Sequence, residues 1–310
     1  MDCILLGTGG MMPMPFRLLT SLIVRKGGRN YMFDAGEGTQ IGLKIAKPGL
    51  RALRMIAITH LHADHCLGLP GILMLRAQME NPEPLTIVGP PGIANFVNSV
   101  RDSIDFYVNY PIEFIEWHDN ADDIAYQDHE IVLYWAPVKH SIFCLGYRLE
   151  EPVRPGKFHT GAAQTLEIPK GPLWSQLQNG QTVTLPDGRI ISPEQVLGPP
   201  RSGRAISFVV DTRPTDSVVR LCRNVDLAFV EGMFKQELQA EAEEKGHLTA
   251  VEAARLTREA GSKRVVFVHL SPRYQTVDLP YILNEARLEY EHVEMGKESV
   301  KYVVSLPEDE

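Results

Sequence analysis

The sequence has no apolar run close to the roughly 20 residues that a membrane-spanning helix requires. Its first residues, Met1 to Gly7, also lack the basic start and the apolar stretch of a secretory signal peptide. With 44% hydrophobic and 23% charged residues over 310 positions, the composition is that of a globular protein with a sizeable core. We therefore expect one or two globular domains and no association with a membrane.

Cysteine is scarce, and the four that occur form no C-x-x-C pair: Cys3, Cys66, Cys144 and Cys222. Such dispersed cysteines exclude a disulfide framework and are typical of reduced thiols in a cytoplasmic protein. Cys66 follows a histidine-rich motif and could be a metal ligand, although a small packing residue is the favoured interpretation.

An excess of positive charge is also missing, because the formal net charge is −8. This argues against a protein that coats nucleic acids through a generally basic surface. A phosphate-bearing substrate is still allowed, since bound dications and a few arginines can reverse the sign of the field at one site.

What the sequence does contain is a dense group of metal-ligand side chains in Thr59–Gly68, which reads THLHADHCLG. His60, His62, Asp64 and His65 lie within six residues, and imidazoles and carboxylates are good ligands for zinc and similar cations. On an extended stretch His60 and His62 project to the same side, whereas Asp64 and His65 point elsewhere as the chain enters a helix. One loop can therefore offer ligands to two neighbouring metal ions.

Three further candidates, His140, Asp211 and His269, each follow a predicted strand. A single histidine after a strand is more often an ordinary core or surface residue, but the ends of neighbouring strands converge at one edge of a sheet. We therefore assign His60, His62 and His140 to one ion, Asp64, His65 and His269 to a second, and Asp211 to a bridge between them. This count leaves each ion an open position for water, as hydrolysis of a phosphodiester, thioester or lactam requires.

Strands alternate with helices along most of the chain, which predicts an α/β protein. The predicted strands are Cys3–Leu6, Ser21–Arg25, Tyr31–Asp34, Met55–Thr59, Leu85–Val88, Ile112–Trp117, Glu130–Pro137, Ile206–Val210, Leu227–Glu231 and Arg264–Val268. The predicted helices are Gly38–Ile45, Leu69–Met79, Pro91–Asp102 and Thr249–Glu259, the last with a capping box between Thr249 and Glu252.

Residues 150–204 interrupt this alternation with many prolines and glycines and little core-forming periodicity. We expect an inserted excursion rather than a packed layer. The cationic side chains assigned to this excursion are Arg148, Arg154, Lys157 and Lys170, with His159 beside them. They could contact phosphates. A mobile surface loop or a dimer element is the alternative interpretation of the excursion.

These patterns resemble the metallo-β-lactamase superfamily and, within it, the tRNase Z (ribonuclease Z) family. The resemblance covers nearly the whole chain. Two parts of the resemblance are more specific: the stretch Phe33–Gln40, which contains a glutamate and a threonine, and the Gly171-Pro172 segment. The other matching parts are Leu6–Gly9, Thr59–Gly71, Val88–Gly92, His140, Gly146–Arg148, Asp211–Arg213 and His269–Tyr274.

The resemblance implies a single hydrolase domain over residues 1–310, built as an αββα sandwich, with residues 150–204 as a protruding flexible arm that grips tRNA. It implies two zinc ions per subunit and a homodimer in which the arm of one subunit presents tRNA to the active site of the other. Histidine and carboxylate ligands would also accept manganese or iron.

The implied reaction is endonucleolytic removal of the 3′ trailer of precursor tRNA, which leaves a 3′-hydroxyl. Asp64 is then both a ligand and the proton acceptor. By position, His247 matches the histidine that assists proton transfer to the leaving oxygen, and Glu231 matches the glutamate that orients it. A surface histidine at the start of a helix is the alternative for His247.

Two segments depart from the family pattern. The early loop, usually P-x-K-x-R-N, keeps Pro13 and Arg17 but lacks the lysine and the asparagine, which leaves the cleavage position and the discrimination of CCA open. The segment Val230–Met233 keeps Glu231 but loses the flanking histidine and threonine.

Two other functions are therefore considered beside the nuclease. One is a phosphodiesterase with the same two-metal site that acts on a small substrate such as a cyclic nucleotide. The other is a catalytically silent member of the family that binds RNA or a partner.

Overall fold

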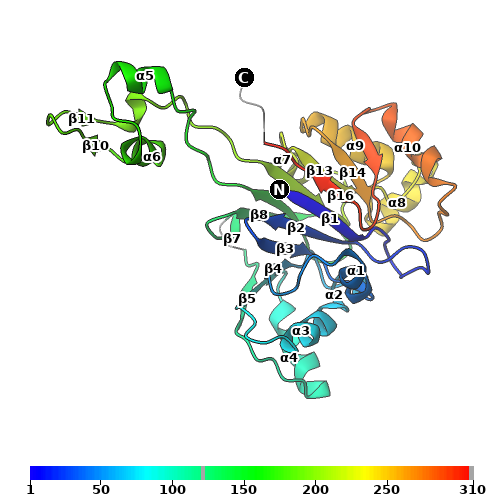
Figure 1. Cartoon of the computed structure of the whole chain (residues 1–310). Coiled ribbons are helices and arrows are strands. Elements are labelled where there is room, and N and C mark those ends of the chain that lie inside the picture. Colours follow the sequence, from blue (N-terminus) through cyan, green and yellow to red (C-terminus); the bar gives the residue numbers. More distant parts are fainter. Residues whose placement is uncertain (120–122, 307–310) are drawn as a thin grey trace. The chain divides into compact units, whose positions relative to one another are not determined.

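The computed structural model describes residues 1–119 and 123–306, and it divides into two compact units (Figure 1). The larger unit joins residues 1–150 to the chain from Arg204 onward, and the smaller one is Glu151–Gly203. In the described part of the chain, no helix is both long and apolar enough to cross a membrane.

The first sheet of the larger unit has seven strands in the order β16-β1-β2-β3-β4-β5-β6. Neighbouring strands from β3 to β6 are parallel, whereas β16, β1, β2 and β3 pair antiparallel. The strands are β1 (Asp2–Gly7), β2 (Ser21–Lys26), β3 (Arg29–Phe33), β4 (Leu53–Ala57), β5 (Leu85–Gly89), β6 (Ile112–Glu116) and β16 (Lys301–Val303).

The second sheet also has seven strands, in the order β15-β14-β13-β12-β9-β8-β7. Neighbours from β12 to β15 are parallel, and β7, β8, β9 and β12 pair antiparallel. The strands are β7 (Ile124–Gln127), β8 (Val132–Val138), β9 (Cys144–Glu150), β12 (Ala205–Val209), β13 (Leu227–Glu231), β14 (Val265–Val268) and β15 (Val293–Met295).

Alternation of side chains along the strands builds three apolar layers. In β2, Leu22 and Val24 join the cluster between the two sheets, whereas Ile23 joins the cluster on the outer face of the first sheet. Leu149 of β9 and Phe208 of β12 belong to the central cluster from the other side. The two sheets therefore pack face to face with both faces buried, which explains why their central strands are apolar throughout.

Helices cover the outer faces, as the colours of Figure 1 show for this unit. The first sheet is covered by α1 (Thr39–Ala46), α3 (Leu69–Ala77) and α4 (Ile93–Ile104), and the second by α7 (Asp216–Leu221), α9 (Ala250–Glu259) and α10 (Leu279–Arg287). Two further helices, α2 (Ala63–Cys66) and α8 (Gln239–Lys245), and the 3₁₀ turn η2 (Gln236–Leu238) lie in connections. The architecture is an αββα sandwich, so the predicted fold class is confirmed.

The smaller unit, which we call the inserted unit (Glu151–Gly203), has a core of its own. Its elements are α5 (Thr160–Thr165), α6 (Pro172–Gln178), the hairpin β10 (Val183–Thr184) and β11 (Ile190–Ile191), and the 3₁₀ turn η1 (Pro193–Gln195). They enclose a cluster of buried residues that includes Ala163, Leu177 and Val196. The excursion expected over residues 150–204 therefore has a small packed core, which the sequence did not indicate because helices this short show no helical period.

Arg148 also differs from its expected place. It lies in β9 of the larger unit and not in the inserted unit. Its guanidinium is bound by the Glu150 carboxylate and by the carbonyl groups of Leu221 and Arg223. It is therefore a structural side chain rather than one of the cations of the insert.

Asp128 ties the two sheets together at the end of β7. Its carboxylate accepts hydrogen bonds from the hydroxyl of Tyr31 in the first sheet (2.8 Å), from Tyr126 (3.2 Å) and from the guanidinium of Arg29 (2.8 Å), and two backbone N–H groups complete the set. Burial raises the pKa of this carboxyl, but the hydrogen bonds outweigh burial and the pKa lies below its usual range.

We expect Asp128→Asn to lower the free energy of unfolding by about 1–3 kcal/mol, because an amide cannot accept all five hydrogen bonds. The lowered pKa means that wild-type Asp128 stabilises the fold above the pKa of an unfolded aspartate, about 3.9, and that this contribution is lost as the pH falls below it. Urea unfolding at pH 7 and pH 3 measures both effects. Asp187→Asn, at an exposed turn, is the control. Equal losses in the two variants would contradict the prediction.

Candidate metal centre

The histidine motif begins after β4 and continues into α2, so that its backbone changes from extended to helical. His62 is the N-cap of α2 with an extended backbone (φ −69°, ψ 149°), and Asp64 and His65 follow within the helix. His60 and His62 therefore project together, and their ring atoms Nε2 and Nδ1 lie 2.9 Å apart. The change of backbone turns Asp64 and His65 toward a second position, as predicted.

The three distant candidates reach the same place from strand ends. His140 follows β8, Asp211 follows β12 and His269 follows β14. Asp211 and His269 have left-handed backbones, with φ of 53° and 54°, and Asp34 after β3 has φ 55°. Such a conformation is uncommon for residues other than glycine. It turns the chain sharply at the strand end beside the histidine motif.

Among the described residues, potential metal ligands form three close groups, one of which is Asp211, His247 and His269. The other two contain all seven predicted ligands. Within each group the potential ligand atoms lie within 4.8 Å of one another. These two groups are His60, His62, His140 and Asp211, and Asp64, His65 and His269. This is the division made from the sequence.

Asp211 lies between the two groups and is 2% exposed. Its Oδ2 atom is 3.6 Å from Nε2 of both His60 and His140, whereas Oδ1 is 3.6 Å from Nε2 of His65 and 3.1 Å from Nε2 of His269. Each oxygen therefore faces a different group, which is the arrangement of a bridging carboxylate.

The distances between the potential ligand atoms agree with those found around a bound metal ion. Ligand atoms around tetrahedral zinc lie about 3.3–3.4 Å apart, as metal–nitrogen bonds of about 2.0–2.1 Å require. The corresponding separations here run from 2.9 to 3.6 Å. The buried Oδ1 atom of Asp211 also has no hydrogen-bond partner among the described residues, and a buried acceptor of this kind suits a cation.

The protonation states of the predicted ligands can also be compared with metal binding, because a histidine must be neutral to bind a metal. Burial and the charge of His65 lower the pKa of His60 well below its usual value, and burial lowers the pKa of His62. For His65 burial acts in the same direction, but the carboxylates of Asp211 and Asp34 outweigh it and raise the pKa. A proton on His65 and a bound cation are thus alternative ways of balancing the buried carboxylates.

Further groups fix the orientation of the imidazoles. Nδ1 of His65 donates to Asp34 at 2.8 Å, and Asp34 also accepts the backbone N–H of Thr59 at 2.7 Å. Nδ1 of His140 donates to the carbonyl of Gly246 at 2.9 Å. In both rings Nε2 is left to face the cluster. Sequence reasoning assigned no role to Asp34, although it follows a strand as Asp211 does, and that position was the available signal.

The structure places His247 and Glu231 beside the cluster. Nδ1 of His247 lies 3.0 Å from Oε2 of the fully buried Glu231, whose other oxygen accepts the N–H of Thr212 at 2.6 Å. The His247 ring stacks on that of His269, with centroids 5.5 Å apart. Burial lowers the pKa of His247, but the charge of Glu231 and the hydrogen bond to it outweigh burial and raise the pKa to about 9.

The early loop between β1 and β2 closes over the second group. The backbone N–H of Met11 donates to Oδ2 of Asp64 at 2.6 Å. Gly10 packs so closely on His269 that an added Cβ atom would lie 2.6 Å from its ring, so no larger residue fits there. The retained Arg17 is buried and donates to the carbonyl of Ser271 at 3.4 Å, which makes it a structural part of the loop.

Comparison with known proteins connects this site to a family. The family model of the Beta-lactamase superfamily domain matches residues 195–270, and that of the Anti-Pycsar protein Apyc1 matches residues 1–98. Curated relatives named Ribonuclease Z from Treponema denticola and Treponema pallidum are each 40% identical to the chain. The first match covers 93% of this chain and 92% of the relative, and the second covers 99% of both.

Solved structures give the same fold. Human tRNase Z, short form, superposes with a TM-score of 0.71 at 22% identity over 99% of this chain and 100% of the human one. The metallo-beta-lactamase fold protein YhfI from Bacillus subtilis gives 0.67 at 16% identity over 97% and 98% of the two chains.

The αββα sandwich and the clustered histidines and aspartates at its strand ends define a hydrolase of the metallo-β-lactamase fold. Within that class the relatives that match over nearly the full length decide the assignment. The chain belongs to the ribonuclease Z family.

We expect Asp34→Ala to weaken zinc binding about 10–100-fold, because His65 loses the acceptor that orients its ring. Asp34→Asn keeps an acceptor oxygen and is expected to weaken zinc binding less. Titration with zinc against a chromogenic chelator measures the affinity. Asp226→Ala is the matched control, since this carboxylate also accepts a backbone N–H but lies at the opposite end of the strands. Wild-type zinc affinity in Asp34→Ala would contradict the orienting role.

Proposed function

We propose that this chain is a metal-dependent endoribonuclease that removes the 3′ trailer of precursor tRNA and leaves a 3′-hydroxyl on the tRNA. The observation that carries the proposal is the 40% identity to proteins named Ribonuclease Z over nearly the whole chain. The clustered side chains at the strand ends supply a site suited to phosphodiester hydrolysis. The four cysteines are buried and unpaired, which supports the cytoplasm as the place of action.

We assign two zinc ions to each chain. His60, His62 and His140 would hold one, Asp64, His65 and His269 the other, and Asp211 both. Bound there, the ions would supply Lewis acidity toward phosphate oxygens and activate water as a nucleophile.

The chain's own groups handle the protons. Asp64, whose Oδ2 accepts the backbone N–H of Met11, is assigned as the acceptor of a proton from the attacking water. Glu231 holds His247 by Nδ1 and keeps it protonated, which leaves Nε2 as the donor to the departing 3′ oxygen of the tRNA. In the whole reaction, the oxygen of water forms a bond to phosphorus, the P–O3′ bond breaks, and O3′ takes up a proton.

We assign the inserted unit to tRNA binding. It folds around its own small core, so it can present side chains on a fixed surface. Arg154, Lys157 and Lys170 are suited to phosphate contacts, and the Lys170 ammonium lies 5.8 Å from the Trp174 ring, beside which a base or sugar could pack.

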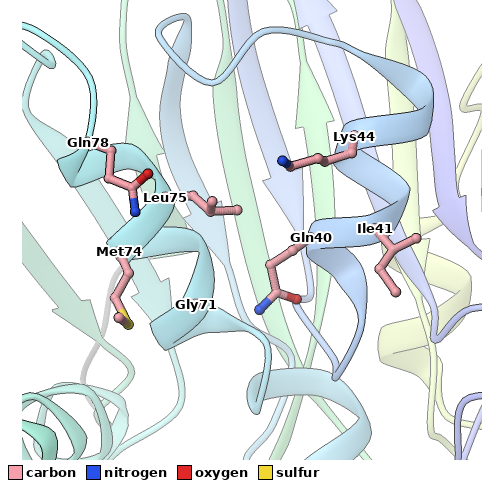
Figure 2. A pocket seen from close by; sticks show the side chains of 7 residues that line it. All are labelled: Gln40, Ile41, Lys44, Gly71, Met74, Leu75 and Gln78. Carbon is pink, nitrogen blue, oxygen red and sulfur yellow. The ribbon is translucent and has the colours of Figure 1, made fainter.

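The homodimer expected from the resemblance has a suitable surface on the larger unit. Between α1 and α3 lies an apolar groove of 430 Å³. Its lining includes Ile41, Met74 and Leu75 together with Gln40 and Lys44, and Figure 2 shows these side chains. Ile41 is 55% exposed and the neighbouring Ile45 is 60% exposed. We propose that a second copy of the chain covers this face, because paired copies would remove these side chains from water.

One observation favours the second candidate, a phosphodiesterase for a small substrate. The early loop presents Met11, Met12 and Phe16, each about half exposed. It has Pro15 and Leu18 in place of the lysine and the asparagine of the family pattern. An apolar loop suits a single nucleobase as well as an RNA end.

Turnover of precursor tRNA and of bis(p-nitrophenyl) phosphate by the zinc-reconstituted protein separates the candidates. We expect one cut at the 3′ end of the tRNA, with a 3′-hydroxyl on the product, and mapping on precursors with and without encoded CCA locates it. Asp64→Ala should slow cleavage by at least about 10³-fold while tRNA affinity stays within severalfold. Asp226→Ala is the control. Fast hydrolysis of the small ester without cleavage of the RNA would contradict the nuclease proposal. Fewer than two zinc ions per chain would favour a catalytically silent protein that binds RNA or a partner.

For the dimer, we expect the double substitution of Ile41→Glu and Met74→Glu to convert a dimer into a monomer, because four like charges would face one another across the two-fold axis. Light scattering coupled to size exclusion measures the mass. Leu288→Glu, at an exposed leucine directly after α10, should leave the dimer intact. A monomeric wild type, or a double variant that still dimerises, would contradict the interface.

A further inference from the structure

The segment Gly246–Thr249, between α8 and α9, serves the site in two ways. It carries His247, and its Gly246 carbonyl accepts the Nδ1 hydrogen of the predicted ligand His140. Gly246 has φ 75° and lies against the His140 ring, where an added Cβ atom would be 3.0 Å from Nδ1. A small displacement of this segment would therefore move both His247 and His140.

The side chain of Arg213 binds the backbone of this segment. Its guanidinium donates to the carbonyl of His247 and binds both oxygens of Glu252, at 2.9 and 2.7 Å. The two charged side chains are 12% and 9% exposed, so the pair is largely shielded from water. Arg213 itself is fixed near the cluster, because its N–H donates to the carbonyl of Lys139 at 2.7 Å, one residue before His140.

Glu252, which Arg213 binds, also binds the last residue of the segment, Thr249. Its carboxylate also accepts the backbone N–H of Thr249 at 2.9 Å, while Thr249 accepts the N–H of Glu252, so the two form the capping box of α9. The capping box was expected from the sequence, but nothing in the sequence indicated that Arg213 binds the same carboxylate.

The ring of His247 is fixed separately. Glu231 accepts its Nδ1 hydrogen and the N–H of Thr212, the residue before Arg213. Thr212 and Arg213 thus act on the same histidine, one through the carboxylate that binds its ring and one through its backbone carbonyl. Both follow directly from Asp211, so the turn after β12 sets the place of His247 relative to the cluster.

We propose that Arg213 is a positioning residue for the reaction: with Glu252 it clamps Gly246–Thr249 and so sets the positions of His247 and His140. A bidentate guanidinium–carboxylate pair has a defined orientation, which a single point charge lacks. The clamp touches neither substrate nor the reacting atoms. Its effect on cleavage rests on the proposed nuclease function, whereas its effect on the segment does not.

The experiment compares Arg213→Ala and Arg213→Lys with Glu252→Gln, which keeps an oxygen for the Thr249 cap but loses the charge. The matched control is Arg255→Ala, which removes the exposed ion pair of another α9 arginine with Glu289. Hydrogen exchange of the zinc-free proteins follows the amides of Gly246–Thr249, and kcat and KM are measured on precursor tRNA.

We expect Arg213→Ala to speed exchange of these amides at least about tenfold. It should lower kcat about 10–100-fold with KM changed less than about threefold. Arg213→Lys and Glu252→Gln should fall between Arg213→Ala and wild type, and Arg255→Ala should match wild type.

Wild-type exchange and kcat in Arg213→Ala would overturn the clamp. A rise in KM at constant kcat would also overturn it, because that result places Arg213 in contact with RNA. If Arg213→Ala does not fold, wild-type exchange and kcat in both milder variants would overturn it instead. A wild type that leaves precursor tRNA uncut refutes the nuclease proposal alone, and the exchange rates still decide the clamp.

Discussion

The carboxylate of Asp211 lies between two groups of imidazoles, and the rest of the site is arranged around it. Each oxygen faces one group, and the residue takes a left-handed backbone at the end of β12 to put them there. A carboxylate this deeply buried must be compensated by positive charge. The parallel order of β12, β13 and β14 in one sheet and of β3, β4 and β5 in the other brings the necessary side chains to it.

Around this carboxylate, orientation is controlled by groups that are themselves held by the fold. Asp34 fixes His65, the Gly246 carbonyl fixes His140, and Glu231 fixes His247. The early loop is fastened in the same way, since Glu298, far along the chain, accepts the backbone N–H groups at both stems of that loop. The orientation of the site's side chains therefore depends on backbone contacts that any change in the surrounding loops would disturb.

Much of the fold was readable from the chain. The predicted strands agree with the structure within a few residues, and the Thr249–Glu252 capping box starts α9 as expected. Helices such as α7 and those of the inserted unit were missed because six or seven residues are too few to reveal a helical period. The pairing of Arg213 with Glu252 was beyond sequence reasoning, because the partners lie 39 residues apart in different elements.

The sequence by itself determined which side chains are available for chemistry and in what local geometry. The motif from His60 to His65 combines an extended stretch with a helix start, so its division into two directions follows from backbone periodicity alone. That His140, Asp211 and His269 meet this motif could be predicted from their places at strand ends, but only the tertiary structure put them there. It alone decided that Asp34 and Arg213 support the site. Those contacts depend on strand order and on the packing of two sheets, which place residues far apart in the chain within hydrogen-bond distance.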